Sequence, residues 1–149
     1  MHKGVICLTK ATDEQDAISN VESFLDSYGD GKVWDWFEIG GRWSDTLGVN
    51  GHYPVPLKEC VTVVEEWKQD LEAEADELWD KLINAREKEK SGEEKFGMSG
   101  YFAARYSEAK YDSFCFNSNV YDIDNNTNNP EEALKEPEQY FAVMVDMHN

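Results

Sequence analysis

Basic residues and long apolar runs are both scarce in this sequence. Its 149 residues include 14 Lys and Arg against 31 Asp and Glu, which gives a net charge of −17. A surface of this sign repels DNA, RNA and anionic lipids, so we expect no direct nucleic-acid partner. No apolar run reaches the roughly 18 residues of a membrane-spanning helix, and the N-terminal stretch has no small-residue cleavage site. We therefore expect a cytoplasmic protein with no membrane partner.

Motifs of metal and cofactor chemistry are also missing. Cys7, Cys60 and Cys115 are far apart and form no Cys-x-x-Cys pair, so we expect inert core thiols rather than a zinc site. The sequence has no phosphate-binding P-loop and no GxGxxG, HExxH or GxSxG motif. We expect no cofactor and no metal, and we assign no catalytic residue. Whether the protein is an enzyme is left open, and a binding protein is favoured.

The residues that are present can build a core. Hydrophobic residues make up 40% of the chain and aromatic residues 13%, which predicts one folded domain over residues 1–149. Apolar, β-branched runs predict strands at 4–9, 33–39, 113–121 and 140–147. Helical periodicity predicts helices at 12–28, 60–90 and 98–110, with one helical turn at 131–135. This order predicts an α+β, two-layer domain in which helices cover one face of a small, mostly antiparallel sheet of about four strands.

Two of the predicted helices have clear signals. Thr12 and Gln15 have the spacing of a capping box, which predicts a helix start at Thr12. Residues 60–90 contain neither Gly nor Pro, and apolar residues recur there every seven positions. That pattern predicts one long helix of roughly eight turns.

The long helix carries a band of acids. Glu66, Asp70, Glu74 and Glu77 are spaced by four, four and three residues, which places them on one helical face. Like charges at this spacing destabilise an isolated helix by a few tenths of a kcal/mol per pair. Two interpretations stay open: a solvated surface that favours solubility, or a surface that binds a basic partner.

Residues 34–43 are the densest unusual segment, with three Trp, two acids, a Gly pair and one Arg. One interpretation is a ligand site in which aromatic walls surround a phosphate that Arg42 binds. Its residues would be Trp34, Trp36, Gly40, Gly41, Arg42 and Trp43. The other interpretation is core packing around a Gly-Gly turn, with Arg42 paired to a nearby acid.

Two further patterns have the form of ion sites. Asp146 and His148 lie two residues apart on a predicted strand, so they share a face and have the form of a metal or proton-relay pair. Residues 122–128 place oxygen donors at alternate positions, as a calcium loop does, but Thr127 replaces the required Gly and Ala133 the required Glu. We favour an exposed histidine and a solvated Asx-rich turn.

Residues 35–44, Asp-Trp-Phe-Glu-Ile-Gly-Gly-Arg-Trp-Ser, resemble a group of small, mostly uncharacterised proteins encoded by bacteriophages and prophages. The group shares the pattern Asp-Trp-aromatic-x-Ile/Val-Gly-Gly-Arg-Trp. The closing strand, residues 143–148, is similar to the end of such proteins. The resemblance covers about twenty residues and leaves the long helix outside it. It implies a phage origin and carries over no activity; an anti-CRISPR or other anti-defence role is an expectation that rests on the acidic surface.

These observations support three functional hypotheses. The first is an acidic inhibitor, in effect a DNA mimic, whose Glu66, Asp70, Glu74 and Glu77 occupy the basic nucleic-acid site of a host defence protein such as a CRISPR effector. The second is a small-ligand or nucleotide-binding protein, with hydrolysis as one option, that uses residues 34–43. The third is an assembly protein whose long helix pairs with a second copy in a homodimer.

Overall fold

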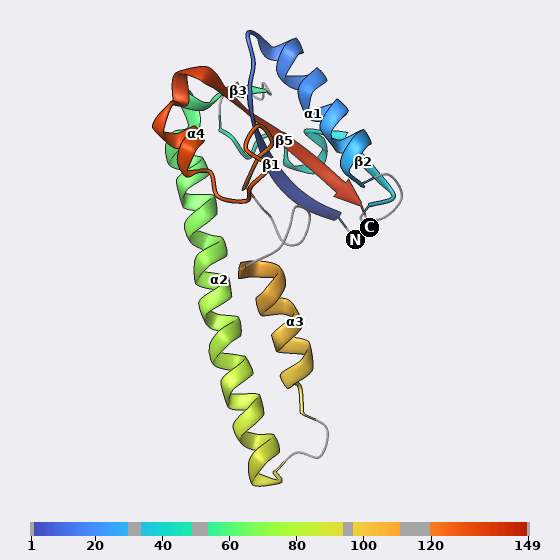
Figure 1. Ribbon diagram of the computed structural model, residues 1–149, viewed down its shortest axis with the longest axis vertical. Helices are drawn as coiled ribbons and strands as arrows, with labels where there is room; N and C mark the ends of the chain where they lie inside the picture. The colour runs from blue at the N-terminus through green and yellow to red at the C-terminus, as the bar shows by residue number, and fades with distance from the viewer. Residues whose placement is uncertain (1, 30–33, 49–53, 94–96, 111–119, 149) are drawn as a thin grey trace. The chain divides into compact units, whose positions relative to one another are not determined.

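The computed structural model describes residues 2–29, 34–48, 54–93, 97–110 and 120–148 (Figure 1). The chain divides into two compact units, residues 1–68 with 113–149, and residues 69–112. The single domain over residues 1–149 stays a prediction.

The first unit contains a mixed sheet of five strands (Figure 1). They are β1 (His2–Lys10), β2 (Trp36–Ile39), β3 (Val55–Pro56), β4 (Val120–Asp122) and β5 (Tyr140–His148). β1 and β5 pair antiparallel along their full length. β2 and β3 both pair antiparallel with the other edge of β5, and β4 pairs parallel with β1. The sheet is therefore mostly antiparallel, as predicted; of the predicted strand at 113–121, residues 113–119 lie outside the described residues.

The helices agree with the predicted pattern. They are α1 (Glu14–Gly29), α2 (Leu57–Ser91), α3 (Ser99–Lys110) and α4 (Glu131–Lys135), with short 3-10 turns η1 (Gly41–Trp43) and η2 (Pro137–Gln139). Both the α+β class and the long acidic helix are confirmed. α2 begins three residues earlier than predicted and has non-helical backbone angles at Cys60, where the helix is kinked.

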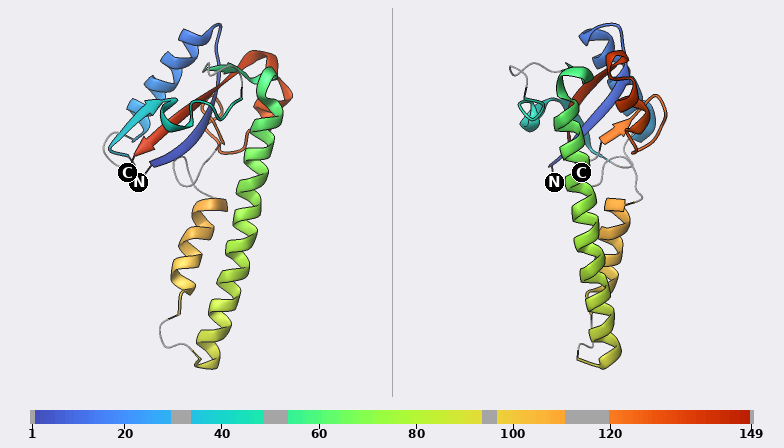
Figure 2. Two further views of the ribbon diagram at one scale, coloured as in Figure 1. Left: turned by 180° about the vertical axis from the view of Figure 1, so that it is seen from behind. Right: turned by 90° about the vertical axis from the view of Figure 1, so that its left-hand side faces the viewer.

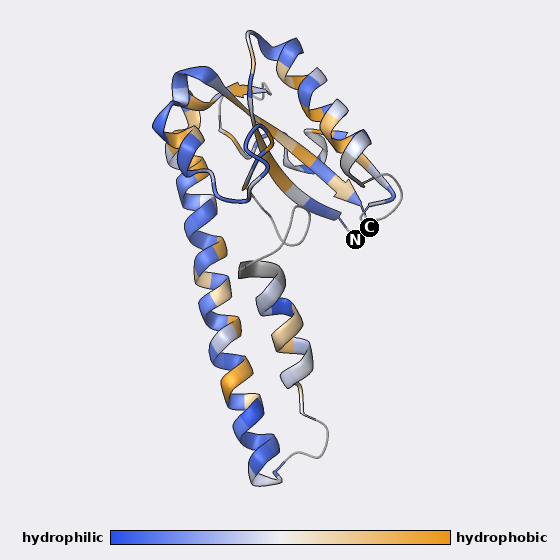
Figure 3. Cartoon of the chain, viewed as in Figure 1, coloured by the Kyte–Doolittle hydropathy of each residue, from blue (hydrophilic) through white to orange (hydrophobic). Residues whose placement is uncertain are grey.

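The central strands β1 and β5 are buried on both faces. Val5 and Cys7 of β1 pack with Val21 and Leu25 of α1 on one face. Ile6 and Leu8 pack on the other face in a cluster that includes Leu57, Cys60 and Val64 of α2 and Ala133 of α4. Figure 3 shows β1 and β5 as largely apolar strands. The sequence predicted helices on one face of the sheet, but in the structure helices cover both faces. Burial on both faces explains why β1 and β5 are continuous apolar runs rather than alternating ones.

The second unit is a helical hairpin of α3 and the part of α2 from residue 69 onward. Both views in Figure 2 show α3 beside this part of α2. The α2 side chains that are buried recur at helical spacing: Leu71, Ala75, Leu78, Leu82 and Ala85. Across the hairpin, the rings of Trp79 and Tyr106 lie 5.0 Å apart, and Ser99 Oγ donates to Glu89 Oε2 at 2.9 Å.

The start of α1 differs by one residue from the predicted capping box. The backbone N–H of Asp16 donates to Asp13 Oδ1 at 2.8 Å, and the N–H of Thr12 donates to Asp16 Oδ2 at 2.9 Å. Asp13 is therefore the capping residue, one position after the predicted Thr12. The Asp16 carboxylate accepts from Thr12, the residue before the cap, whereas the reciprocal bond of a capping box comes from the cap residue itself.

Replacing Asp13 by Ala should lower the free energy of unfolding by about 1 kcal/mol, because the Asp16 N–H loses its acceptor. Urea denaturation followed by circular dichroism measures the change. Gln15→Ala, at an exposed neighbouring position, is the control and should stay within about 0.5 kcal/mol of the parent. Equal losses in the two variants would contradict the assignment of the cap.

Candidate functional site

The Gly-Gly turn of residues 34–43 is built around the carboxylate of Asp146. Gly40 and Gly41 have φ angles of 80° and 51°, and the Gly40 N–H donates to the Met144 carbonyl at 2.6 Å. The Arg42 N–H then points to Asp146 Oδ2 at 3.3 Å. Asp146 is only 2% exposed. The turn therefore covers a buried carboxylate and supplies one of its hydrogen-bond donors.

A second donor to Asp146 comes from the N-terminal strand. His2 Nδ1 lies 2.9 Å from Asp146 Oδ1, in an ion pair when the imidazole is protonated. His148 pairs instead with Asp35, at 3.2 Å between Nδ1 and Oδ2. Asp146 and His148 are two residues apart on β5, as predicted, but they do not pair with each other: Asp146 contacts His2 and His148 contacts Asp35. Sequence reasoning missed His2 because no local pattern links the two ends of the chain.

The rings of Trp36, His148 and His2 form a compact cluster at the ends of β2, β5 and β1. The Trp36 ring stacks on the His148 ring at 5.2 Å between centroids, and the His2 ring meets both edge to face, at 5.0 Å from His148 and 5.3 Å from Trp36. His148 of β5 lies directly opposite His2 of β1 and Trp36 of β2. Cross-strand pairs contribute roughly 0.2–1 kcal/mol each, so the cluster stabilises this end of the sheet.

The other residues of the segment divide between core and surface. Trp34 is buried in the core beneath α1, and Trp43 packs over Gly4, where an added Cβ would lie 3.0 Å from the indole. Trp36 is 43% exposed and the Arg42 side chain is exposed. The Arg42 amide donates to the buried Asp146 carboxylate, so it is not available to a phosphate at the turn. These contacts support the core-packing interpretation of the segment over the phosphate-binding one.

The structure shows no metal centre in the part of the chain that it describes. Within those residues, no group of three or more His, Cys, Asp or Glu side chains is arranged to hold an ion. In the Asx-rich loop, Asp122 Oδ1 accepts the N–H groups of Asp124 and Asn125, both at 3.1 Å, and Oδ2 accepts from Asn125 Nδ2 at 2.7 Å. The loop's own amides thus satisfy this buried carboxylate, as in an Asx turn.

The four predicted partner-binding acids differ in their surroundings. Glu66, in the first unit, and Asp70, in the second, are exposed. Glu74 lies 3.5 Å from the Arg105 guanidinium, and Glu77 lies 2.7 Å from Lys81 Nζ. The hydrogen bond from Lys81 lowers the pKa of Glu77, which keeps this carboxylate ionised. Two of the four acids are therefore partly neutralised within the hairpin.

The described cysteines are buried. Burial raises the pKa of the Cys7 thiol, and burial together with the neighbouring Glu59 raises that of Cys60 to about 12. Both thiols are free and lie in the two cores of the first unit. The prediction of core thiols holds for these two, and Cys115 lies outside the described residues.

Both buried thiols should resist alkylation in the folded protein. With a pKa of about 12, roughly one Cys60 in ten thousand is a thiolate near pH 8, and the thiolate is the reacting form. We expect a Cys115→Ser variant treated with iodoacetamide to keep its mass when folded and to gain two adducts in guanidinium chloride. Rapid modification of Cys60 in the folded protein would contradict its burial.

Gly41→Ala should destabilise the first unit more than Gly48→Ala. Both glycines have positive φ angles, which disfavour a side chain by about 1 kcal/mol. A Cβ at Gly41 would also collide with Asp146 Cβ and lie 2.8 Å from Asp146 Oδ2, whereas nothing lies within 4 Å of a Cβ at Gly48. Thermal unfolding of the two variants measures the difference. Equal shifts in melting temperature would contradict the packing of Gly41 on Asp146.

The structure offers no membrane-spanning helix among the described residues, and the comparisons with known proteins place the chain in no family. Among the described helices, none is both long and apolar enough to cross a membrane. Comparisons with family models, curated proteins and solved structures found no match.

Proposed function

We propose that this chain is a phage-encoded acidic binding protein that occupies the basic nucleic-acid site of a host protein, such as a CRISPR-type defence protein. The observation that carries the proposal is the charge of α2 between residues 70 and 80. This stretch contains six acids and no base. Asp70, Glu72, Asp76, Glu77 and Asp80 are exposed, and Glu74 is half-buried.

The spacing of these charges supports mimicry of a nucleic acid. At 1.5 Å of rise per residue, the six acids extend over about 15 Å of helix axis, or one charge per about 3 Å. One strand of DNA presents a phosphate about every 3.4 Å along its axis. A basic groove that accepts one nucleic-acid strand would therefore meet a similar linear charge density on α2.

The resemblance of residues 35–44 to phage-encoded proteins agrees with this role but does not supply the binding surface. The Gly-Gly-Arg segment contacts Asp146, His148 and β1 of its own unit. We infer that it stabilises the sheet. Nucleotide binding through the exposed Arg42 side chain is the less favoured alternative, because the turn itself packs on the buried Asp146 carboxylate and leaves no free Arg42 amide for a phosphate.

The proposal predicts capture of nucleic-acid-binding proteins that free DNA can displace. We expect the immobilised protein to retain them from host lysate at low salt, to release them as salt rises, and to release them when duplex DNA is added. Neutralising Glu66, Asp70, Glu74 and Glu77 to Gln or Asn should weaken capture by about tenfold or more, at about 0.3–0.5 kcal/mol per contact.

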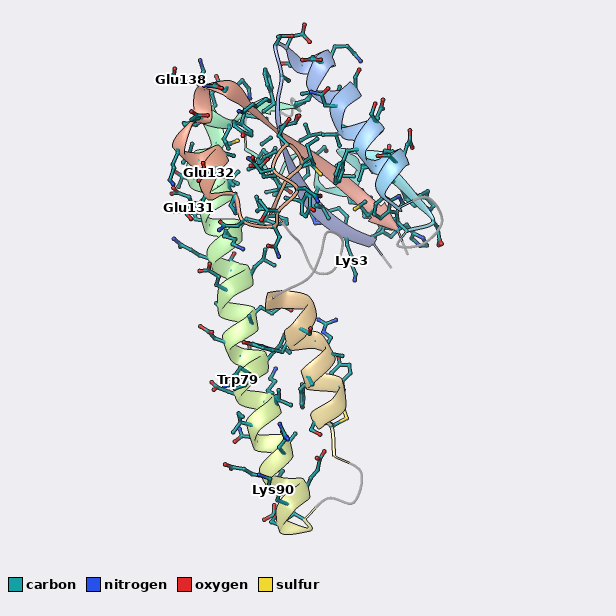
Figure 4. All side chains as sticks on the ribbon, viewed as in Figure 1. Lys3, Trp79, Lys90, Glu131, Glu132 and Glu138 are labelled. Atoms are coloured by element: carbon teal, nitrogen blue, oxygen red, sulfur yellow. The ribbon has the colours of Figure 1, made fainter. Side chains whose placement is uncertain are left out.

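A second quadruple variant controls for net charge. Glu131, Glu132, Glu136 and Glu138 are exposed acids near α4 in the first unit, three of them labelled in Figure 4. Changing these four to Gln removes the same charge and should leave capture nearly unchanged. If both variants lose capture equally, net charge rather than α2 is responsible, and if DNA displaces nothing, the nucleic-acid site is the wrong target.

A further inference from the structure

Large apolar side chains are exposed mainly on the second unit. Among the described residues, the large hydrophobic side chains that are exposed are Trp36, Trp79, Ile83, Met98 and Tyr101. All except Trp36 lie in the second unit, Trp79 and Ile83 on α2, Tyr101 on α3 and Met98 just before α3. Trp79 is 46% exposed and Ile83 is 37% exposed, and they lie four residues apart on α2. Figure 4 labels Trp79 on this helix.

A row of acids continues this apolar pair along the same helical face. Glu72, Asp76, Trp79 and Ile83 follow the spacing i, i+4, i+7 and i+11, and Asp80 adjoins Trp79. No ion pair involves Glu72, Asp76 or Asp80 within the described part of the chain. The bases of the hairpin that form ion pairs, Lys81 and Arg105, contact Glu77 and Glu74 instead. Within the described residues, the acids beside Trp79 are therefore not paired with a cation.

The Trp79 ring is also held in place. Its centroid lies 5.0 Å from that of Tyr106 on α3, a contact that limits its rotation while almost half of the side chain stays exposed. A preorganised aromatic side chain loses less conformational entropy on binding than a free one. Trp is also the residue type most enriched among interface hot spots.

We infer that Trp79 and Ile83, with Glu72, Asp76 and Asp80 beside them, bind a basic amphipathic segment of a protein partner. This inference rests on the proposed function and names the apolar anchor that the acidic helix uses. An apolar row flanked by Lys or Arg matches both parts of the surface, since its apolar side chains cover Trp79 and Ile83 and its cations meet the acids. A second copy of the same face would bring acids against acids, so like-charge repulsion disfavours self-association through it.

Two synthetic peptides of about 18 residues test the inference. Both contain the same numbers of Leu and Lys; one places Leu at helical spacing, and the other disperses Leu evenly around the helix. Calorimetry at about 0.15 M salt should show tighter binding of the amphipathic peptide to the full chain. Trp79→Ala should weaken that binding by about tenfold and leave the weaker binding of the dispersed peptide unchanged.

Three further variants make the test specific. Trp79→Phe preserves an aromatic contact with Tyr106 and should retain most of the affinity, as expected if an aromatic ring at this position is the anchor. Ile83→Ala should weaken binding of the amphipathic peptide without affecting that contact. Tyr101→Ala is the matched control, because Tyr101 is a similarly exposed aromatic residue, at 54%, of the same unit. It lies one turn before Arg105, which contacts Glu74 rather than Trp79, so its removal should leave binding unchanged.

The outcomes separate this inference from the proposed function. Equal binding of both peptides to the parent protein, or parent-like affinity in both Trp79→Ala and Ile83→Ala, would overturn the anchor. A loss in Tyr101→Ala as large as in Trp79→Ala would overturn it as well. Neutralising Glu72, Asp76 and Asp80 should weaken both peptides; if it weakens neither while Trp79→Ala still does, the anchor stands and the electrostatic function fails.

Discussion

The pairing of β1 with β5 is the interaction on which the rest of the first unit depends. Nine residues at the start of the chain pair with nine near its end, from His2 opposite His148 to Lys10 opposite Tyr140. Every other strand pairs with one of these two. Because both are buried on both faces, α1 and the first turns of α2 each pack on a surface that the pairing creates. Loss of this pairing would remove the sheet and both cores.

The same pairing gives the Trp-rich segment its role. Asp146 sits near the end of β5, where its carboxylate is buried between the Gly40–Gly41 turn and His2. A buried carboxylate requires hydrogen-bond donors, since an unpaired one loses its solvation without compensation. The Arg42 amide and the His2 imidazole supply them. Residues 34–43, which have the composition of a ligand site, thus contribute to the stability of the sheet by covering Asp146 and donating a hydrogen bond to it.

The proposed function rests on the surface that the fold leaves exposed. On α2, Glu77 and Glu74 are paired with Lys81 and Arg105, whereas the neighbouring row of acids, beside Trp79 and Ile83, has no ion pair among the described residues. A paired cation reduces the attraction of an acid for a basic partner, so the second row is the better candidate for such contacts. The exposed aromatic side chain lies on the second row, so charge and apolar contact coincide there.

Local sequence determined much of this protein. The α+β class, the long helix and the closing strand follow from hydrophobic periodicity, which acts between residues a few positions apart. The tertiary structure decided the partners. His2 contacts Asp146 across 144 positions, and Arg105 reaches Glu74 across a helical hairpin. Such contacts depend on which strands and helices become neighbours, and no local pattern encodes that choice. For the same reason the Gly-Gly-Arg segment could be identified from sequence as unusual, but only the fold showed that its carboxylate partner is Asp146.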